Sequence, residues 1–155
     1  MGETEDLIEE FVTESREHIA DIENDLINIE AAGEDMDKAS IDRVFRAAHS
    51  IKGSAKFLDL SKIGDLAHIM EDVLNLIRSG KISTDRDVAG ALLQGSDMLK
   101  LMFDNVDASN DMDIHQQIDV LQVILNKNTR EPQKKAGQQG RDNAPQAIPL
   151  FDVTA

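Results

Sequence analysis

His49 is the residue whose type and neighbours are best suited to chemistry, because an exposed imidazole nitrogen can act as a nucleophile. Gly53 follows it one helical turn later. Glycine inside a helix costs about 1 kcal/mol relative to alanine, so its presence here indicates that space beside the histidine is needed. Basic side chains surround that space. The segment therefore predicts a site in which a dianionic group could sit beside His49 without steric or electrostatic penalty.

The charges of this chain are unevenly distributed. The net charge is −14, and residues 1–36 hold thirteen Asp and Glu against the single Arg16. Residues 43–62 instead have only Asp59 as an acid, against Arg43, Arg46, Lys52, Lys56 and Lys62. The acidic total argues against nucleic acid or an anionic membrane as a general partner. A basic run alone is more often a solvated helix face, and the histidine within it is what favours an anion site.

Composition places further limits on the chain. There is no cysteine, which excludes disulfides, thiolate metal sites and thiol nucleophiles and fits a reducing, cytoplasmic setting. The amino-terminal MGETEDLIEE is acidic where a secretory signal needs positive charge. No apolar run approaches the roughly 18 residues of a membrane span. We expect a cytoplasmic protein with no membrane segment.

Apolar residues recur at helical spacing through most of the chain. The first predicted helix covers residues 5–31 and ends at Gly33. The second begins between Asp37 and Ser40 and passes through His49 to Leu58. The remaining three are predicted to start at an N-cap Ser61, at an N-cap Thr84, and near Met112 with an end near Lys127.

These elements predict an all-α fold, an up-and-down four-helix bundle with an additional C-terminal helix and a disordered tail. The bundle is expected to occupy residues 1–127 as one domain. Residues 128–155 are polar, rich in Gln, Pro and Gly, and aperiodic, which is typical of a linker or tail. The late segment IPLFDV could be a docking segment or the start of a further domain. Gly95 interrupts the fourth helix at an inward position, which marks either a close helix approach or a weak point.

Projection at about 100° per residue places His49 on the shoulder of the second helix, facing outward. A histidine packed in the core would project the other way. On the third helix Glu71 lies on the shoulder of the apolar stripe, and it could reach His49 if the two helices pack antiparallel. A carboxylate accepting from Nδ1–H would fix the tautomer and leave the Nε2 lone pair available. His68 projects nearly opposite the stripe and is expected on the surface.

The residues around His49 resemble a known family. VFRAAHSIKGSAKFL, residues 44–58, is similar to the H-x-x-K-G-[SA]-[SA] motif of histidine phosphotransfer domains. RAAHSIKG most resembles the N-terminal phosphoacceptor domain of CheA-type chemotaxis histidine kinases, and LAHIMEDVL, residues 66–74, resembles that family's H-x-M-E segment. The resemblance covers about residues 5–107 in helix order and is far more specific than a lone histidine.

The resemblance implies roles for five residues. His49 matches the phosphoacceptor, Lys52 the lysine near the phosphoryl oxygens, Gly53 the glycine that clears space, and Glu71 the carboxylate that hydrogen-bonds the histidine. His68 matches a polar neighbour of this network, although its projection lies further out than that role needs. Replacing Glu71 is expected to affect folding little if the site is on the surface.

The resemblance also implies partners. A histidine kinase catalytic domain, in cis or in trans, would bind ATP and Mg²⁺, because this chain has no glycine-rich phosphate loop and no GK[ST] sequence. No cofactor is expected in the chain itself, and whether it is part of an enzyme stays open. A response-regulator receiver domain would accept the phosphoryl group, drawn to the basic segment. Phe45, Phe57 and Ile69 are expected to be exposed near the shoulder and are candidate contacts for such partners, with ordinary bundle packing at least as good an explanation for Phe45.

Two alternatives come from other classes of function. A non-catalytic docking or structural bundle would need no chemistry at His49. A di-metal bundle would need inward glutamates and repeated Glu-x-x-His pairs, whereas this chain has a single His68-x-x-Glu71 in the reverse order. We therefore expect no metal site.

Overall fold

The computed structural model describes residues 2–32 and 37–129. They divide into two compact units at the link between Gln122 and Val123, and each unit is described by itself. The elements are α1 (Glu3–Ala32), α2 (Lys38–Phe57), α3 (Ser61–Arg78), α4 (Arg86–Asp104), the short 3-10 helix η2 (Val106–Asp111) and α5 (His115–Thr129). The described residues contain no strand, and the predicted all-α class is confirmed.

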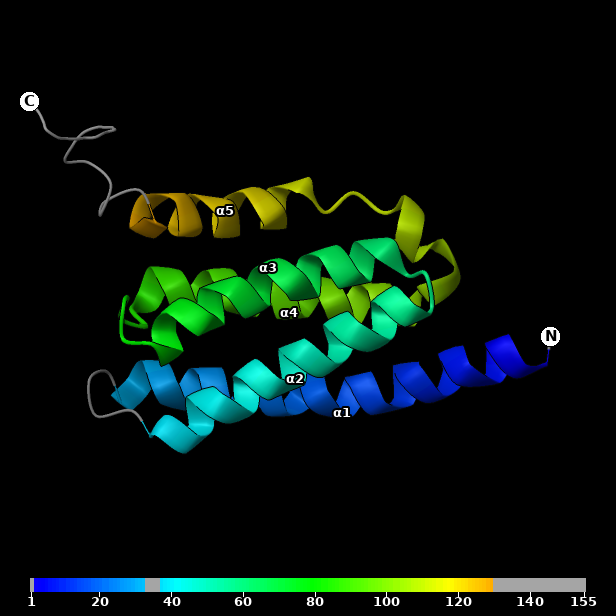
Figure 1. The fold of residues 1–155 in the computed structure, drawn as a ribbon, viewed down its shortest axis with the longest axis horizontal. Helices are drawn as coiled ribbons and strands as arrows, with labels where there is room; N and C mark the ends of the chain where they lie inside the picture. The colour runs from blue at the N-terminus through cyan, green and yellow to red at the C-terminus, as the bar shows by residue number, and fades with distance from the viewer. Residues whose placement is uncertain (1, 33–36, 130–155) are drawn as a thin grey trace, which may run out of the picture. The chain divides into compact units, whose positions relative to one another are not determined.

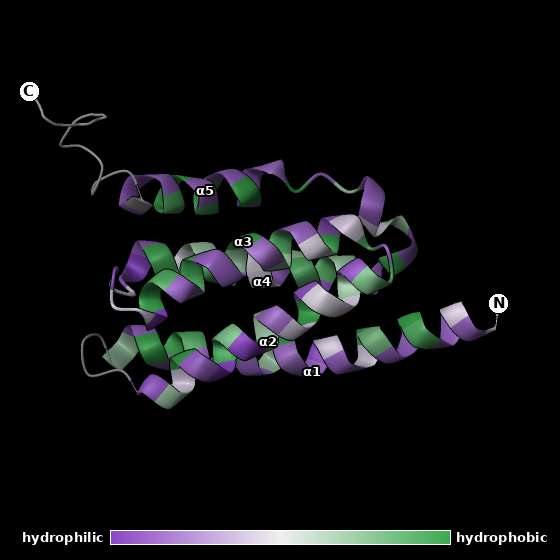
Figure 2. Cartoon of the chain, in the orientation of Figure 1, coloured by the Kyte–Doolittle hydropathy of each residue, from purple (hydrophilic) through white to green (hydrophobic). Residues whose placement is uncertain are grey.

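Helices α1 to α4 form the predicted up-and-down four-helix bundle (Figure 1). Each helix reverses the direction of the one before it, and α2 contacts α1 and α3 while α4 contacts α3 and α1. Hydrophobic and hydrophilic residues alternate along these helices, as amphipathic helices require (Figure 2). The core residues that are least exposed include Ile22, Leu26, Ile51, Met70, Leu74 and Leu92. Each side chain of this size contributes about 1.5–3 kcal/mol to stability by leaving water.

The turn between α2 and α3 sets the antiparallel pairing of the two helices that carry the predicted site. Asp59 adopts a left-handed backbone with φ of 60°. The Leu60 N–H donates to the Ala55 carbonyl and the Asp59 N–H to the Lys56 carbonyl, which is the Schellman arrangement of a helix C-terminus. Leu60 is itself buried. Because the connection is this short, residues at similar distances from the turn on α2 and α3 face one another.

Two predicted helix caps were wrong by one residue. Leu60, not Ser61, occupies the N-cap position of α3. Asp85, not Thr84, caps α4, and its carboxylate accepts from the Val88 N–H at 2.9 Å. Thr84 is instead buried. In both cases the observed N-cap, Leu60 or Asp85, is the residue with a non-helical backbone just before the first helical residue.

Groups at the N-terminus of α3 form hydrogen bonds with a residue from a distant part of the chain. Asn110 in η2 accepts from the Lys62 N–H at 3.4 Å and from the Ser61 hydroxyl at 3.3 Å, and its amide donates to the Asp59 carbonyl at 3.0 Å. Neither η2 nor this cap was predicted from the sequence, because η2 has no helical apolar period. The hydrogen bonds of Asn110 connect the turn after α2 to the segment that follows α4.

Two glycines allow helices of the bundle to approach closely. A Cβ at Gly64 of α3 would lie 3.1 Å from Lys56 Cγ on α2. A Cβ at Gly95 of α4 would lie 2.8 Å from Met70 Sδ on α3. Gly95 therefore marks a close helix approach, the first of the two predicted explanations.

Within the part of the chain that the structure describes, no helix is long and apolar enough to cross a membrane. The predicted tail lies outside the described residues from position 130 onward. The predicted turn at Gly33 lies outside them as well. Residues 123–129 are helical and belong to the second unit.

Candidate functional site

His49 lies on the exposed side of α2, as predicted. Its side chain is 62% exposed, whereas Ala48 and Ile51 on the same helix are buried in the core. The helical period places it there, because neighbouring positions take the apolar stripe. The imidazole is therefore accessible to another molecule.

Glu71 of α3 connects His49 to Lys52. Its Oε2 lies 2.5 Å from His49 Nδ1, and its Oε1 accepts from Lys52 Nζ at 2.6 Å. The Glu71 side chain is only 9% exposed and that of Lys52 is 21% exposed. The antiparallel packing of α2 and α3 thus brings together three of the predicted residues. The expected surface position of Glu71 was wrong, because the carboxylate is buried between the helices.

The protonation of Glu71 decides the tautomer of His49. Burial by itself would raise the pKa of the Glu71 carboxyl, but hydrogen bonds from Lys52 and His49 outweigh burial and lower that pKa below its ordinary value. An ionised carboxylate has no proton to donate, so His49 Nδ1 must be the donor in their hydrogen bond. In the neutral ring Nε2 then carries the lone pair. The nitrogen that Glu71 does not contact is therefore the nucleophilic one.

The lowered pKa of Glu71 makes its contribution to folding depend on pH. Because the folded pKa lies below the unfolded value, the stabilisation is fully present above the ordinary pKa of 4.5 and is lost as pH falls through the folded pKa. We expect the stability advantage of the wild type over Glu71→Gln to shrink below about pH 4.5. Urea unfolding at a series of pH values measures this difference.

Asp65→Asn is the matched control for that titration, since it removes an exposed carboxylate from the same helix. Its free energy of unfolding should stay close to that of the wild type, since the carboxylate is exposed. A Glu71→Gln difference that stays constant between pH 3 and 7 would contradict the assigned interaction.

The aromatic ring of Phe45, one helical turn earlier on α2, packs against His49. The rings of Phe45 and His49 are stacked, with centroids 6.3 Å apart and planes inclined by 12°. The Arg78 guanidinium lies 4.0 Å from the centroid of the Phe45 ring, and Arg78 Nε is 3.9 Å from Asp42 Oδ1. Sequence reasoning had no role for Arg78. The four-residue spacing of Phe45 and His49 on one helix was the available indication.

The basic residues near His49 are partly used in structural contacts. Arg43 forms two hydrogen bonds with the buried carboxylate of Asp25, at 3.0 and 3.2 Å. Lys62 donates to the Met112 carbonyl at 3.1 Å. Within residues 2–32 and 37–129, Arg46 and Lys56 have no ion-pair partner. Arg46 and Lys56 are the two exposed cations that remain of the predicted basic group.

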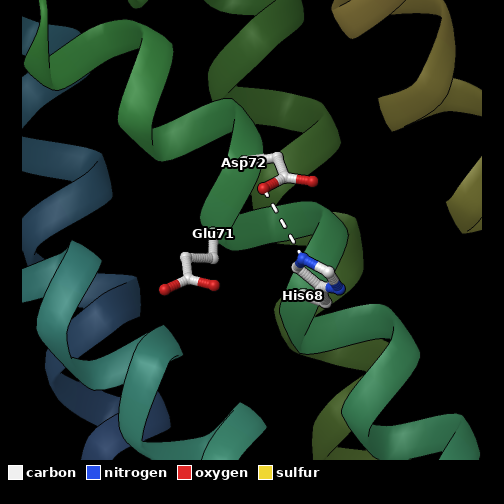
Figure 3. Close-up of side chains that lie close together, drawn as sticks. All are labelled: His68, Glu71 and Asp72. Carbon is white, nitrogen blue, oxygen red and sulfur yellow. Dashed lines mark ion pairs between the residues drawn. The ribbon is translucent and has the colours of Figure 1, made fainter.

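His68 lies outside the hydrogen bonds that join His49, Glu71 and Lys52. It is half exposed, as predicted, and its Nε2 is 3.8 Å from Asp72 Oδ1. Figure 3 shows Glu71 directed toward α2, while His68 and Asp72 lie further around α3 and face away from α2. Ligand-type atoms of these three residues lie within 4.8 Å of one another. Both oxygens of Glu71 already accept hydrogen bonds from α2, so a metal ion here would compete with the contacts of His49.

The predicted docking residues differ in exposure. Phe57 is 79% exposed on α2, so it remains available to a partner. Ile69 is buried at 7% exposure and lines a groove of about 510 Å³ together with His68 and residues of α5. The expectation that Ile69 is exposed was wrong, because residues between Asp113 and Gln122 line the groove on this side of α3.

Around Gly53 the helix surface is open. A Cβ built on Gly53 meets no atom within 4 Å. Glycine is therefore not required by packing in the described residues. The role of Gly53 in clearing space next to His49 stays a prediction.

Several proteins are similar to this chain. The chain is 33% identical over 150 residues to the sensor histidine kinase CheAY of Helicobacter pylori, covering 87% of this chain and 18% of that protein. It is 36% identical over 100 residues to the chemotaxis protein CheA of Borreliella burgdorferi, covering 64% of this chain and 11% of that protein. The chain thus spans less than a fifth of the length of these two relatives.

Solved structures share its fold. The CheA phosphotransferase domain from Thermotoga maritima is similar with a TM-score of 0.62 and 29% identity, covering 68% of this chain and 98% of that domain. The phosphorylated P1 domain of CheA3 from R. sphaeroides, solved in complex with CheY6, is similar with a TM-score of 0.69 and 24% identity, covering 79% of this chain and 98% of that domain.

Family membership follows from a match that includes the whole of the site. Residues 6–109 match the Hpt domain family, and this range holds α2, α3 and every residue of the His49 network. The order of the helices and the exposed histidine on α2 agree with that match. The chain belongs to the Hpt domain family.

Proposed function

We propose that this chain is a phosphoryl carrier of a chemotaxis-like two-component pathway, in which His49 accepts a phosphoryl group from an ATP-bound histidine kinase domain and passes it to a response-regulator aspartate. One observation carries the proposal. The buried Glu71 carboxylate contacts His49 Nδ1, which leaves the lone pair on Nε2 of a side chain that is 62% exposed. The names of the relatives, a sensor histidine kinase and chemotaxis CheA proteins, agree with this role.

Both phosphoryl transfers make or break a single bond, the one between phosphorus and His49 Nε2. In the first, the Nε2 lone pair attacks the γ-phosphorus of ATP, the bond from phosphorus to the bridging oxygen breaks, and its electron pair leaves with ADP. Nδ1 keeps its proton, so positive charge develops on the ring next to the Glu71 carboxylate. In the second transfer, a carboxylate oxygen of the regulator attacks phosphorus, and the P–N electron pair returns to Nε2.

The partners supply what this chain lacks. ATP and Mg²⁺ would be bound by the kinase domain, and the regulator would supply the accepting aspartate. The complex of the CheA3 P1 domain with CheY6 gives a precedent for the second partner. The exposed cations Arg46 and Lys56 would favour the approach of an acidic receiver pocket. We place the carrier in the cytoplasm, where such a kinase would meet ATP.

The deciding experiment is phosphorylation in vitro. The full chain is incubated with γ-labelled ATP, Mg²⁺ and a CheA-like kinase catalytic core, and a receiver domain is then added. We expect label that is lost in acid and retained in base, as a phosphohistidine requires, and that moves to the receiver. A chain that takes no label from a core that labels its own substrate would instead be a docking or structural bundle.

Gly53→Ala tests whether the space beside His49 is used. The added methyl group meets no atom within 4 Å in the unphosphorylated protein. The free energy of unfolding should therefore rise by about 0.5–1 kcal/mol, the usual difference between glycine and alanine in a helix. Phosphorylation should nevertheless slow by about 3- to 10-fold, which corresponds to a penalty near 1 kcal/mol in the transition state. Chemical denaturation and initial labelling rates measure the two effects.

Gly90→Ala is the matched control, because it separates the expected gain in stability from the expected loss in labelling rate. Gly90 also lies inside a helix, α4, and a Cβ there meets no atom within 4 Å. It should gain stability to a similar extent and be labelled at the wild-type rate. If Gly53→Ala is also labelled at that rate, the open surface at Gly53 serves no purpose in transfer.

A further inference from the structure

We propose that Phe45, held in place by Arg78, is a positioning residue that fixes the plane of the His49 ring for phosphoryl transfer. The inference rests on the proposed function of His49. It concerns two residues with no direct contact to the transferred group. Phe45 therefore acts within the site and is not primarily a contact for partners.

The backbone directs the His49 ring toward Phe45. Side chains on a helix lean toward its N-terminus, so a residue at position 49 covers the one four positions earlier. The result is the nearly parallel stack of the two rings, 6.3 Å apart and inclined by 12°. This separation lies within the range in which aromatic pairs attract one another.

Two contacts then restrain the imidazole in different directions. The hydrogen bond from Nδ1 to Glu71 fixes one edge of the ring, but a ring held by one edge can still tilt about that bond. The stack against Phe45 restrains the tilt. An exposed side chain would otherwise lose rotamer freedom only during the reaction, which slows transfer. Because the ring is already stacked on Phe45 in the folded protein, this loss of rotamer freedom occurs during folding and not during the reaction.

Arg78 restrains Phe45 itself. Its guanidinium lies 4.0 Å from the Phe45 centroid, close enough for a cation–π interaction, and its Nε lies 3.9 Å from Asp42. Arg78 is the last residue of α3, while Phe45 and Asp42 belong to α2. The stack therefore depends on the register of the two helices, as does the contact of Glu71 with His49.

The surroundings of His49 are asymmetric along α2. Phe45 fills the side toward the N-terminus, and Gly53 leaves the side toward the C-terminus open. A phosphoryl donor can therefore approach Nε2 from the Gly53 side while the ring is supported from the Phe45 side. This arrangement gives Phe45 and Gly53 complementary tasks.

The test compares Phe45→Leu with Phe45→Tyr in the full chain. Leucine keeps an apolar side chain but removes the ring, and tyrosine keeps the ring. We expect Phe45→Leu to be labelled about 3- to 10-fold more slowly than the wild type, the size expected for the loss of one aromatic pair, and Phe45→Tyr to restore the rate. Arg78→Gln should slow labelling about two- to threefold, and Arg78→Lys should recover it.

A second measurement separates positioning from docking. Phosphoramidate, a small donor that needs no protein interface, should show the same loss for Phe45→Leu as the kinase core does. With the kinase, the loss should appear in kcat and leave KM unchanged. A loss seen only with the kinase, or only in KM, would make Phe45 a docking residue and overturn the proposal.

Nitrogen NMR of the His49 ring tests the geometry without any phosphorylation. In the wild type the Nδ1–H tautomer should dominate, and its proton signal should broaden in Phe45→Leu as the ring becomes mobile. Phe57→Leu is the matched control for the NMR signal alone, which it should leave unchanged, since it removes an exposed phenylalanine from the same helix. An unchanged signal and rate in a folded Phe45→Leu variant would refute the proposal. A wild-type chain that accepts no label from either donor would instead refute the function of His49.

Discussion

Replacing His49 by Gln is expected to abolish phosphorylation of this chain completely. His49 Nε2 is the exposed nitrogen whose lone pair the Glu71 contact leaves available, and glutamine offers no nucleophile of this kind. The variant should remain helical, because the side chain is 62% exposed and glutamine is a good helix former. Labelling with ATP and a kinase core, with circular dichroism as the check on folding, measures both outcomes.

His68→Gln is the matched control for that experiment. His68 is also an exposed histidine, one helix away, and it pairs with Asp72 outside the His49 network. This variant should keep most of its label. Undiminished labelling of His49→Gln, or label found on His68, would be incompatible with His49 as the phosphoacceptor.

The second large effect is expected at Glu71. Glu71→Gln and Glu71→Ala should each slow phosphorylation by about 10- to 100-fold, as for other partners that orient a catalytic histidine. Both remove the carboxylate that selects the Nδ1–H tautomer and that supports positive charge on the ring as the P–N bond forms. Initial labelling rates at saturating kinase measure the loss.

The two Glu71 variants should differ in stability. Glu71 is buried, and alanine at this position leaves the partly buried ammonium of Lys52 without its acceptor. We expect Glu71→Ala to lose about 1–3 kcal/mol of unfolding free energy and Glu71→Gln to lose less, because the amide oxygen can still accept from Lys52. Because Glu71 is buried, we now expect its replacement by alanine to affect folding more than the surface position assumed from the sequence implied.

Asp72→Asn serves as the control for both Glu71 variants, since it removes the adjacent, exposed carboxylate of α3. It should be labelled at the wild-type rate. Wild-type rates in Glu71→Gln and Glu71→Ala would mean that the carboxylate only stabilises the helix pair.

Local helix geometry made much of this protein predictable. The apolar period fixed the helices within a few residues, and the same period placed His49 on the exposed shoulder of α2 and His68 on the surface of α3. These properties depend only on 3.6 residues per turn and on which side chains avoid water. The pairing of His49 with Glu71 was predictable once antiparallel helices were assumed.

Tertiary structure decided how the site is held. The burial of Glu71, its second hydrogen bond from Lys52 and the position of Arg78 over Phe45 all depend on the register of α2 against α3. Asn110 caps α3 from a segment 48 residues away. A helical projection gives the direction of each side chain around the axis of its own helix. It gives neither the distance between two helix axes nor their offset along the axis. Those were set by the short turn at Asp59 and by the close approach of α3 to α2 at Gly64.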